Sequence, residues 1–433
     1  MINTLLNHDN SIHKLSDVAN KLSSLSISNI AAKINERRSK GEKIFNLTIG
    51  DFDPVHFPIP LILEEEIITA YKSKYTNYPV VGGMPELLES VSAHIKYFGG
   101  FDYNPNEIIT GSGSRPLTYI LFKTLINKGD KVINVVPSWN NYNYVQLVEA
   151  EEITFEAKPE NNFMVTPEEI KPLLGFASLI TFNSPSNPAG TTYSSENTKD
   201  IFNLIVEENK RRIAEDNKPL YVFYDIVYWL LTYGNTKFIN PVEVCPEIKD
   251  YIIFVDGISK CFAATGVRLG WAFGPEPVIA KMKQMIAHIG AWSPKPEQVA
   301  VSKFLKDTAE VEKYLKGFKS GLFDRLDLLY KTIMQIKATG IDVDAISPQG
   351  ALYLSVKLNL IGYKTPAGKT ISSVADITNF LLDEAGIAVV PFFAFGANPD
   401  SLWFRISVGV CSLDDVREVC KLLKKVTSGI THL

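Results

Sequence analysis

Cysteine is scarce in this chain. The four cysteines are scattered over 433 residues as Cys245, Cys261, Cys411 and Cys420, without the close pairs that a zinc site uses. Four separated thiols are also too few for a disulfide scaffold in a chain of this length. We therefore expect reduced cysteines, no metal site and a cytoplasmic protein.

Long apolar runs and an excess of basic charge are absent as well. No run of about 18 apolar residues occurs, which predicts that no helix spans a membrane. Residues 1–14 lack the apolar stretch of a signal peptide. With 44 basic and 48 acidic residues the formal net charge is −4, which leaves no basic field for a nucleic acid. Neither a membrane nor a nucleic acid is expected as a partner.

Apolar residues, by contrast, make up 45% of the chain, enough for a large core. In the middle of the chain, short apolar runs rich in β-formers alternate with longer helical patterns, which is typical of a mostly parallel sheet between helices. Ligands collect at the carboxyl ends of the strands in such sheets. The expected strands are Glu107–Thr110, Lys131–Val136, Ile153–Ala157, Ala177–Asn183, Leu220–Tyr224, Tyr251–Asp256 and Leu269–Gly274.

The C-terminal third follows a different pattern. Long helical stretches begin near Val299, and strand-like runs return at Ala351–Val356 and Leu402–Val408. We predict an α/β fold with two parts. The large domain, residues 59–318, holds a mostly parallel seven-stranded sheet between helices. The smaller α/β domain is built from both chain ends, with residues 1–58 as an N-terminal arm and part of that domain, and residues 319–433 as its C-terminal portion.

Lys260 is the first candidate for chemistry. It ends the run Asp256-Gly257-Ile258-Ser259-Lys260, directly after an expected strand, and Arg268 follows eight residues later. A lysine that forms a Schiff base with pyridoxal phosphate (PLP) needs this approach from a strand end, and a nearby arginine suits the phosphate. An isolated lysine is most often a solvated surface residue, so the interpretation depends on partners elsewhere.

Three other strand ends offer contacts to the PLP ring. Asp225 could keep the pyridine nitrogen protonated, although an aspartate at a strand end is more often a turn or helix cap. Tyr228 could reach the ring oxygen O3′, and Asn187, fixed between two prolines, offers O3′ an amide donor. Trp139 could stack on the ring, with core packing as the alternative.

A turn rich in glycine and serine is the candidate phosphate site. Thr110-Gly111-Ser112-Gly113-Ser114-Arg115-Pro116 follows a strand and opens a helical pattern, and N–H groups at a helix start suit a phosphate. Gly113 permits a close approach, Ser114 adds a hydroxyl, and Arg115 and Arg268 add charge. By itself such a turn is a weak signal, and it has neither the P-loop nor the dinucleotide pattern.

Taken in chain order, the motifs resemble those of the class I/II PLP-dependent aminotransferases, the aspartate aminotransferase family of fold type I. The resemblance runs from about Asn46 to Val410. It rests on Pro137-Ser138-Trp139, Ser186-Asn187-Pro188, Asp225-Ile226-Val227-Tyr228, Ser259-Lys260, Gly266-Val267-Arg268-Leu269-Gly270 and Phe404-Arg405-Ile406-Ser407. It implies transfer of the amino group of an L-amino acid to a 2-oxo acid, by a ping-pong mechanism through pyridoxamine phosphate, with Lys260 as the catalytic residue.

The resemblance also implies the substrate contacts. Arg405 matches the arginine that binds the α-carboxylate, which a guanidinium fork suits because two parallel charged bonds fix its orientation. Gly50 matches the glycine whose backbone approaches the same carboxylate, and Trp139 and Asn187 are expected to contact substrate as well as cofactor. Tyr78 matches a tyrosine that reaches the PLP phosphate of the other subunit, which implies a homodimer with shared active sites.

Several alternatives stay open at this point. A C–S lyase or a decarboxylase can share all these residues, and a lyase would release ammonia and pyruvate without an acceptor. A non-catalytic regulator with an aminotransferase-like domain would be expected to add a winged helix and a basic surface, which the sequence lacks. Arg115 or a partner residue could bind a second substrate carboxylate. The loop Phe392–Gly396 could favour an apolar side chain or pack in the core, and Lys210-Arg211-Arg212 are expected on a solvated helix face.

Overall fold

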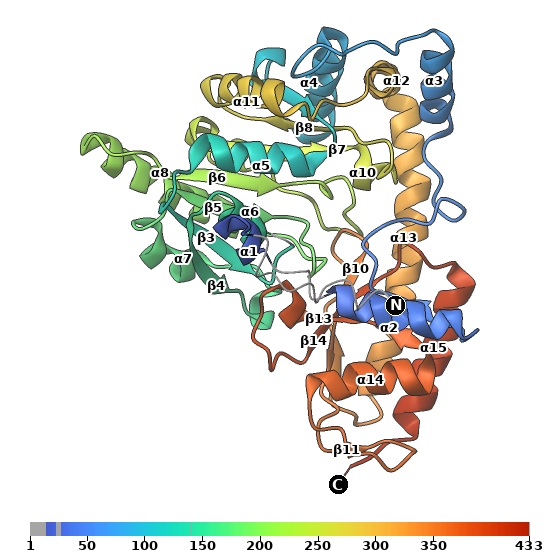
Figure 1. The fold of residues 1–433 in the computed structure, drawn as a ribbon. Coiled ribbons are helices and arrows are strands. Elements are labelled where there is room, and N and C mark those ends of the chain that lie inside the picture. The colour runs from blue at the N-terminus through green and yellow to red at the C-terminus, as the bar shows by residue number, and fades with distance from the viewer. Residues whose placement is uncertain (1–13, 23–26, 140, 433) are drawn as a thin grey trace.

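The computed structural model describes residues 14–22, 27–139 and 141–432 (Figure 1). Its centre is a seven-stranded sheet with the strand order β2-β8-β7-β6-β5-β3-β4. Neighbouring strands are parallel except at β8, which is antiparallel to β2 and β7. The strands are β2 (Ile108–Gly111), β3 (Lys131–Val136), β4 (Glu151–Glu156), β5 (Leu179–Asn183), β6 (Tyr221–Asp225), β7 (Ile252–Gly257) and β8 (Gly270–Phe273). The prediction of a mostly parallel seven-stranded sheet is confirmed.

Helices cover both faces of this sheet. Side chains alternate between the faces of a strand, so that Ile109, Val132 and Leu179 pack in one core and Ile108, Ile133 and Ile180 in the other. Burial on both faces explains why the strands are almost continuous apolar runs. The first core includes α5 (Ser114–Leu125), α6 (Asn141–Leu147) and α11 (Glu276–Ile289), and the second includes α4 (Pro85–Gly99), α7 (Pro167–Leu174) and α8 (Ser195–Ala214).

A second sheet, with the order β13-β14-β10-β9, lies below the first in Figure 1. Its strands are β9 (Val343–Ala345), β10 (Tyr353–Leu358), β13 (Val390–Pro391) and β14 (Trp403–Ser407), and all its pairings are antiparallel. Beside it, β1 (Phe45–Asn46) pairs in parallel with β12 (Ile387–Ala388). The N-terminal segment therefore packs with the C-terminal part, as predicted.

Two helices connect the sheets. After α12 (Lys295–Lys306), the long helix α13 (Thr308–Lys337) runs from the first sheet to the second (Figure 1). Residue 318, where we predict a domain boundary, lies inside α13, and the boundaries at 58 and 318 stay predictions. The remaining elements are α1 (Asp17–Lys21), α2 (Ile27–Ser39), α3 (Leu61–Lys72), α9 (Pro241–Val244), α10 (Ile258–Cys261), α14 (Val374–Ala385), α15 (Leu413–Ser428), β11 (Tyr363–Lys364), β15 (Thr431–His432) and 3-10 turns at Pro105–Glu107, Pro159–Asn161, Pro246–Asp250 and Phe392–Phe395.

The expected charge distribution needs one correction. Lys210 and Arg211 lie half-exposed on α8, but Arg212 is buried and donates to the carbonyl oxygen of Leu174 and to Glu208. All four cysteines are buried and unpaired. In the part of the chain that the structure describes, no helix is both long and apolar enough to cross a membrane, and no group of three or more His, Cys, Asp or Glu residues could hold a metal ion.

Candidate active site

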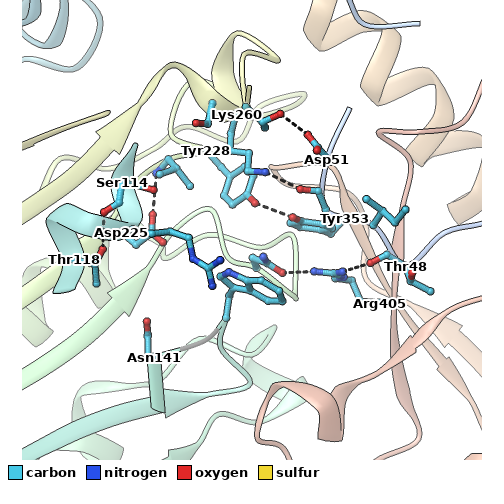
Figure 2. Close-up of a pocket in the computed structure, with 18 of the residues that line it drawn as sticks. Thr48, Asp51, Ser114, Thr118, Asn141, Asp225, Tyr228, Lys260, Tyr353 and Arg405 are labelled. Atoms are coloured by element: carbon cyan, nitrogen blue, oxygen red, sulfur yellow. Dashed lines mark hydrogen bonds between the residues drawn. The ribbon is translucent and has the colours of Figure 1, made fainter. Parts of the chain in front are cut away.

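A cavity of about 540 Å³ lies between the two sheets (Figure 2). Strand register explains why the predicted motifs meet there. Asn183 pairs with Asp225, and Gly111 and Gly257 both pair with Gly270, so that the carboxyl ends of β2, β5, β6 and β7 share one edge. Ten predicted site residues line the cavity: Gly50, Ser114, Arg115, Trp139, Asn187, Asp225, Tyr228, Lys260, Arg268 and Arg405.

Lys260 lies on the short helix α10, immediately after β7. Its amine donates a hydrogen bond of 2.7 Å to the carbonyl oxygen of Gly50. Removal from solvent lowers the pKa of Lys260 to about 8, with the Asp51 carboxylate acting in the opposite direction. An amine with this pKa is partly neutral near pH 7, as a nucleophile or general base must be.

Asp225 is the last residue of β6, and its Oδ1 accepts a hydrogen bond of 3.1 Å from the Val227 N–H. Asp225 therefore also has the turn-forming role that is common for an aspartate at a strand end. Burial nevertheless raises the pKa of Asp225 to about 6, against the smaller lowering effects of that N–H and of Lys260. Among the described residues no cation pairs with this carboxyl, so a protonated pyridine nitrogen would supply what the site lacks.

We predict that Asp225→Asn stabilises the cofactor-free protein at neutral pH. The folded protein holds the Asp225 proton more tightly than the unfolded chain does, so the carboxyl destabilises the fold increasingly from about pH 4 to about pH 6, and fully above that. Asparagine removes this cost, about 1–3 kcal/mol, and keeps the acceptor for Val227.

Thermal unfolding of the two proteins at pH 4 and pH 7.5 measures the effect. The melting temperature of the variant should be higher at pH 7.5, and the difference should vanish near pH 4. Asp102→Asn is the control, because Asp102 is exposed and pairs with Lys96. This variant should not be more stable than the wild type. Equal melting temperatures for wild type and Asp225→Asn at pH 7.5 would contradict the prediction.

Tyr228 and Asn187 extend from the turns after β6 and β5. The Tyr228 hydroxyl lies 2.7 Å from the Tyr353 hydroxyl, and either can be the donor. The Asn187 side-chain oxygen accepts a hydrogen bond of 2.7 Å from Arg405 Nη1. Because this oxygen is engaged, the amide nitrogen of Asn187 is left to donate to a ligand.

Arg405 lies on β14 and is 2% exposed. Its Nη2 donates to the carbonyl oxygen of Thr48, and its guanidinium carbon lies 4.6 Å from the Tyr353 ring and 4.7 Å from the Phe395 ring. Nε is buried without a partner. The described part of the chain places no carboxylate against this guanidinium, so Arg405 is not part of a surface salt bridge. Phe395, from the loop Phe392–Gly396, serves to hold the arginine.

The glycine-serine turn leads into α5, which begins at Ser114. Gly113 has a φ of +95°, and a Cβ on it would lie 2.5 Å from Arg268 Nη2, so only glycine fits there. The Arg268 guanidinium donates to the carbonyl oxygens of Thr265 and Ser112 at 2.7 and 3.0 Å. A guanidinium beside the free N–H groups of a helix start fits a phosphate.

Arg115, Trp139 and Tyr78 are less constrained. Arg115 is exposed at the cavity and has no hydrogen-bond or ion-pair partner among the residues that the structure describes. Trp139 is half-buried, and its ring centroid lies 6.2 Å from that of Phe395. Tyr78 is 83% exposed, packs edge-on against Trp292 and does not line the cavity of its own chain. Its predicted contact with a second subunit stays a prediction.

Sequence reasoning missed several cavity residues. Tyr353 lies between two leucines at the start of β10, where the local pattern resembles a core strand. Asp51 Oδ1 accepts a hydrogen bond of 2.8 Å from Thr265 Oγ1 and so connects the Gly50 loop to the Arg268 turn. Asp51 could have been predicted, because it directly follows the predicted site residue Gly50. Tyr353 could not, because the strand register that places it near Arg405 is not visible in one sequence. Asn46, Thr48, Thr118 and Asn141 also line the cavity.

A lysine at a strand end, a partly buried aspartate without a cationic partner among the described residues, a glycine-arginine phosphate cradle and a second, buried arginine together define a PLP-dependent enzyme of fold type I. Comparison with known proteins identifies the family. The family profile "Aminotransferase class I and II" matches residues 42–423. The chain therefore belongs to the class I and II aminotransferases, and it is a PLP-dependent aminotransferase, as predicted.

Individual relatives cover nearly the whole chain. The probable aspartate/prephenate aminotransferase of Rickettsia bellii is 30% identical over 404 residues, which are 93% of this chain and 96% of that protein. The aspartate aminotransferase of Bacillus sp. (strain YM-2) is 30% identical over 386 residues, 88% and 92% of the two chains. The solved structure of the Thermus thermophilus aspartate aminotransferase with maleate has a TM-score of 0.83 and 25% identity, and covers 96% of this chain and all of that one.

Proposed function

We propose that the protein transfers the amino group of an acidic L-amino acid, of which aspartate is the simplest, to a 2-oxo acid by a ping-pong mechanism. The observation that carries the proposal is that the buried Arg405 and the exposed Arg115 both line the cavity and that neither has a carboxylate partner among the described residues. The names of the relatives and the maleate, a dicarboxylate, in the Thermus structure support the same substrate class.

In this proposal Arg405 binds the α-carboxylate. The Tyr353 and Phe395 rings pack against the guanidinium, with centroids 4.6 and 4.7 Å from its carbon atom. A carboxylate can bind the N–H groups at the edge of the guanidinium with two parallel bonds. The bond to Asn187 fixes the guanidinium further. A substrate held at one end in this way presents its Cα–H bond in a constant orientation.

The other residues act on the cofactor. When bound, PLP supplies an electron sink for the electrons of the Cα–H bond. Asp225 keeps the pyridine nitrogen protonated, while Tyr228 and the Asn187 amide donate to O3′. The phosphate-binding group comprises the α5 N–H groups, Gly113, Ser114 and Arg268, and Trp139 covers the ring.

Lys260 has two roles in the proposal. It holds the cofactor covalently between turnovers, and its freed amine then moves the Cα proton. A pKa of about 8 makes this amine an effective proton acceptor near neutral pH. The Gly50 carbonyl, which accepts from the amine at 2.7 Å, positions it beside the loop that carries Thr48 and Asp51.

Substitution of Arg115 tests the proposed substrate class. We expect Arg115→Gln to lower kcat/KM for L-aspartate by about 10- to 100-fold, since one charged hydrogen bond is worth about 1.5–3 kcal/mol. The kcat/KM for L-alanine should stay within about 2-fold of the wild-type value. Lys123→Gln removes an exposed cation from the same helix outside the cavity and should change neither value. Equal effects of Arg115→Gln on both donors, or no effect on either, would contradict a role in binding the side-chain carboxylate.

We further propose a cytoplasmic homodimer. The proposal is supported by exposed apolar side chains on α3 and the loop after it, where Tyr71, Tyr78, Val80 and Val81 are 41–83% exposed. A second copy would cover this surface, and Tyr78 could then reach the partner's phosphate site. Sedimentation equilibrium measures the assembly directly, and both the wild type and Tyr78→Phe should be dimeric. The variant should bind PLP more weakly than the wild type.

A further inference from the structure

We propose that Tyr353 is a positioning residue for amino-group transfer: its hydroxyl donates to the Tyr228 hydroxyl and thereby commits the Tyr228 proton to the O3′ oxygen of the cofactor. The proposal rests on the role of Tyr228 put forward above. It assigns a task to a side chain that the motifs of the sequence do not single out.

The strand register explains how Tyr353 comes to this place. In the antiparallel pair β10–β14, Ser355 is opposite Arg405. Tyr353, two residues before Ser355, is therefore the diagonal neighbour of Arg405 on the same face, within reach of long side chains. Its ring packs 4.6 Å from the guanidinium carbon of Arg405, and the residue is 1% exposed.

The hydroxyl of Tyr353 extends beyond Arg405 toward the first sheet (Figure 2). It lies 2.7 Å from the Tyr228 hydroxyl, its single hydrogen-bond partner in residues 14–22, 27–139 and 141–432. On its other side it packs against Gly50, where a Cβ would lie 2.5 Å from the phenol oxygen. The nearby Gly50 carbonyl already accepts from Lys260. The Tyr353 hydroxyl is therefore enclosed and held at Tyr228.

Counting protons sets the direction of this hydrogen bond. A tyrosine hydroxyl has one proton to donate and can also accept. If Tyr228 donates to O3′, its proton is not available for Tyr353, so Tyr353 must donate to Tyr228. Burial raises the pKa of both phenols, so both remain protonated at neutral pH. A donor that itself accepts a hydrogen bond is polarised and donates more strongly, and more so away from water.

Tyr353→Phe is the informative variant, because it keeps the ring against Arg405 and removes only the hydroxyl. The measurement is the pH titration of the visible absorbance of the PLP-loaded enzyme, whose midpoint follows the proton at O3′. A weaker donor at O3′ stabilises its ionised form less. The midpoint should therefore rise, by about half a pH unit or more, and the dissociation constant of PLP from the apoprotein, followed by tryptophan fluorescence, should increase several-fold.

A double-mutant cycle separates positioning from packing. In a Tyr228→Phe background, Tyr353→Phe should shift neither the midpoint nor the dissociation constant further, because its only target is gone. Equal shifts in both backgrounds, or no shift from Tyr353→Phe in the wild type, would overturn the proposal. If instead Tyr228→Phe alone leaves the midpoint unchanged, the role of Tyr228 itself fails, so the two failures are distinguishable.

Discussion

Lys260→Ala is expected to lower the turnover number by about 10⁴-fold or more, the usual cost of removing a nucleophile that also acts as general base. The Asp225, Tyr228, Asn187 and phosphate contacts are independent of the lysine side chain. The variant should therefore still bind PLP, but without a covalent bond. Steady-state rates and mass spectrometry after borohydride reduction measure both properties.

The control for this variant is Lys319→Ala. Burial also lowers the pKa of Lys319, which lies on α13 outside the cavity, so the control removes another partly desolvated lysine. It should retain turnover within about 2-fold. Normal turnover in Lys260→Ala, or PLP trapped by borohydride on another lysine of the wild type, would refute the assignment of the catalytic residue.

Arg405→Lys is expected to lower kcat/KM by about 10²- to 10³-fold, since loss of a buried charged hydrogen-bonded contact costs about 2–5 kcal/mol. Lysine keeps the charge but cannot form the fork, and it cannot reach Asn187, Thr48 and a carboxylate at once. Because every amino acid carries the α-carboxylate, acidic, aliphatic and aromatic donors should be affected alike. Arg115→Gln, by contrast, should discriminate among them.

A buried arginine elsewhere serves as the control. Arg212→Lys on α8 should reduce stability, because Arg212 donates to Glu208 and to two carbonyl oxygens, but kcat/KM should stay unchanged. An unchanged kcat/KM in Arg405→Lys, or a loss confined to one class of donor, would contradict binding of the α-carboxylate by Arg405.

The sequence predicts the site well because its residues come from strand ends. Asn187, Asp225 and Lys260 each follow a recognisable apolar strand, and parallel strands bring such ends to one edge. Local residue types were therefore enough to predict ten of the residues that line the cavity. The seven strands were predicted for the same reason, with ends that differ from the observed ones by up to two residues. At β4, for example, pairing with β3 extends the strand to the polar residues Glu151 and Glu152.

The features that the sequence did not predict depend on contacts between elements that are far apart in the chain. The run Leu269–Gly274 has the same pattern whether its strand is parallel or antiparallel, so the reversed direction of β8 was not visible. Arg212 follows Lys210 and Arg211 in a charged run, and only the packing of α8 against α7 buries it. Tyr353 acquires its contacts from the register of β10 with β14, which no local pattern encodes.

Amino-group transfer in two half-reactions can be observed directly in a single experiment. The purified PLP-loaded protein is mixed with L-aspartate in the absence of any 2-oxo acid, while the absorbance of the cofactor is followed. We expect conversion of the bound cofactor to pyridoxamine phosphate with one equivalent of oxaloacetate and no ammonia. Release of ammonia or carbon dioxide while the cofactor remains PLP would contradict it and would identify a lyase or a decarboxylase instead.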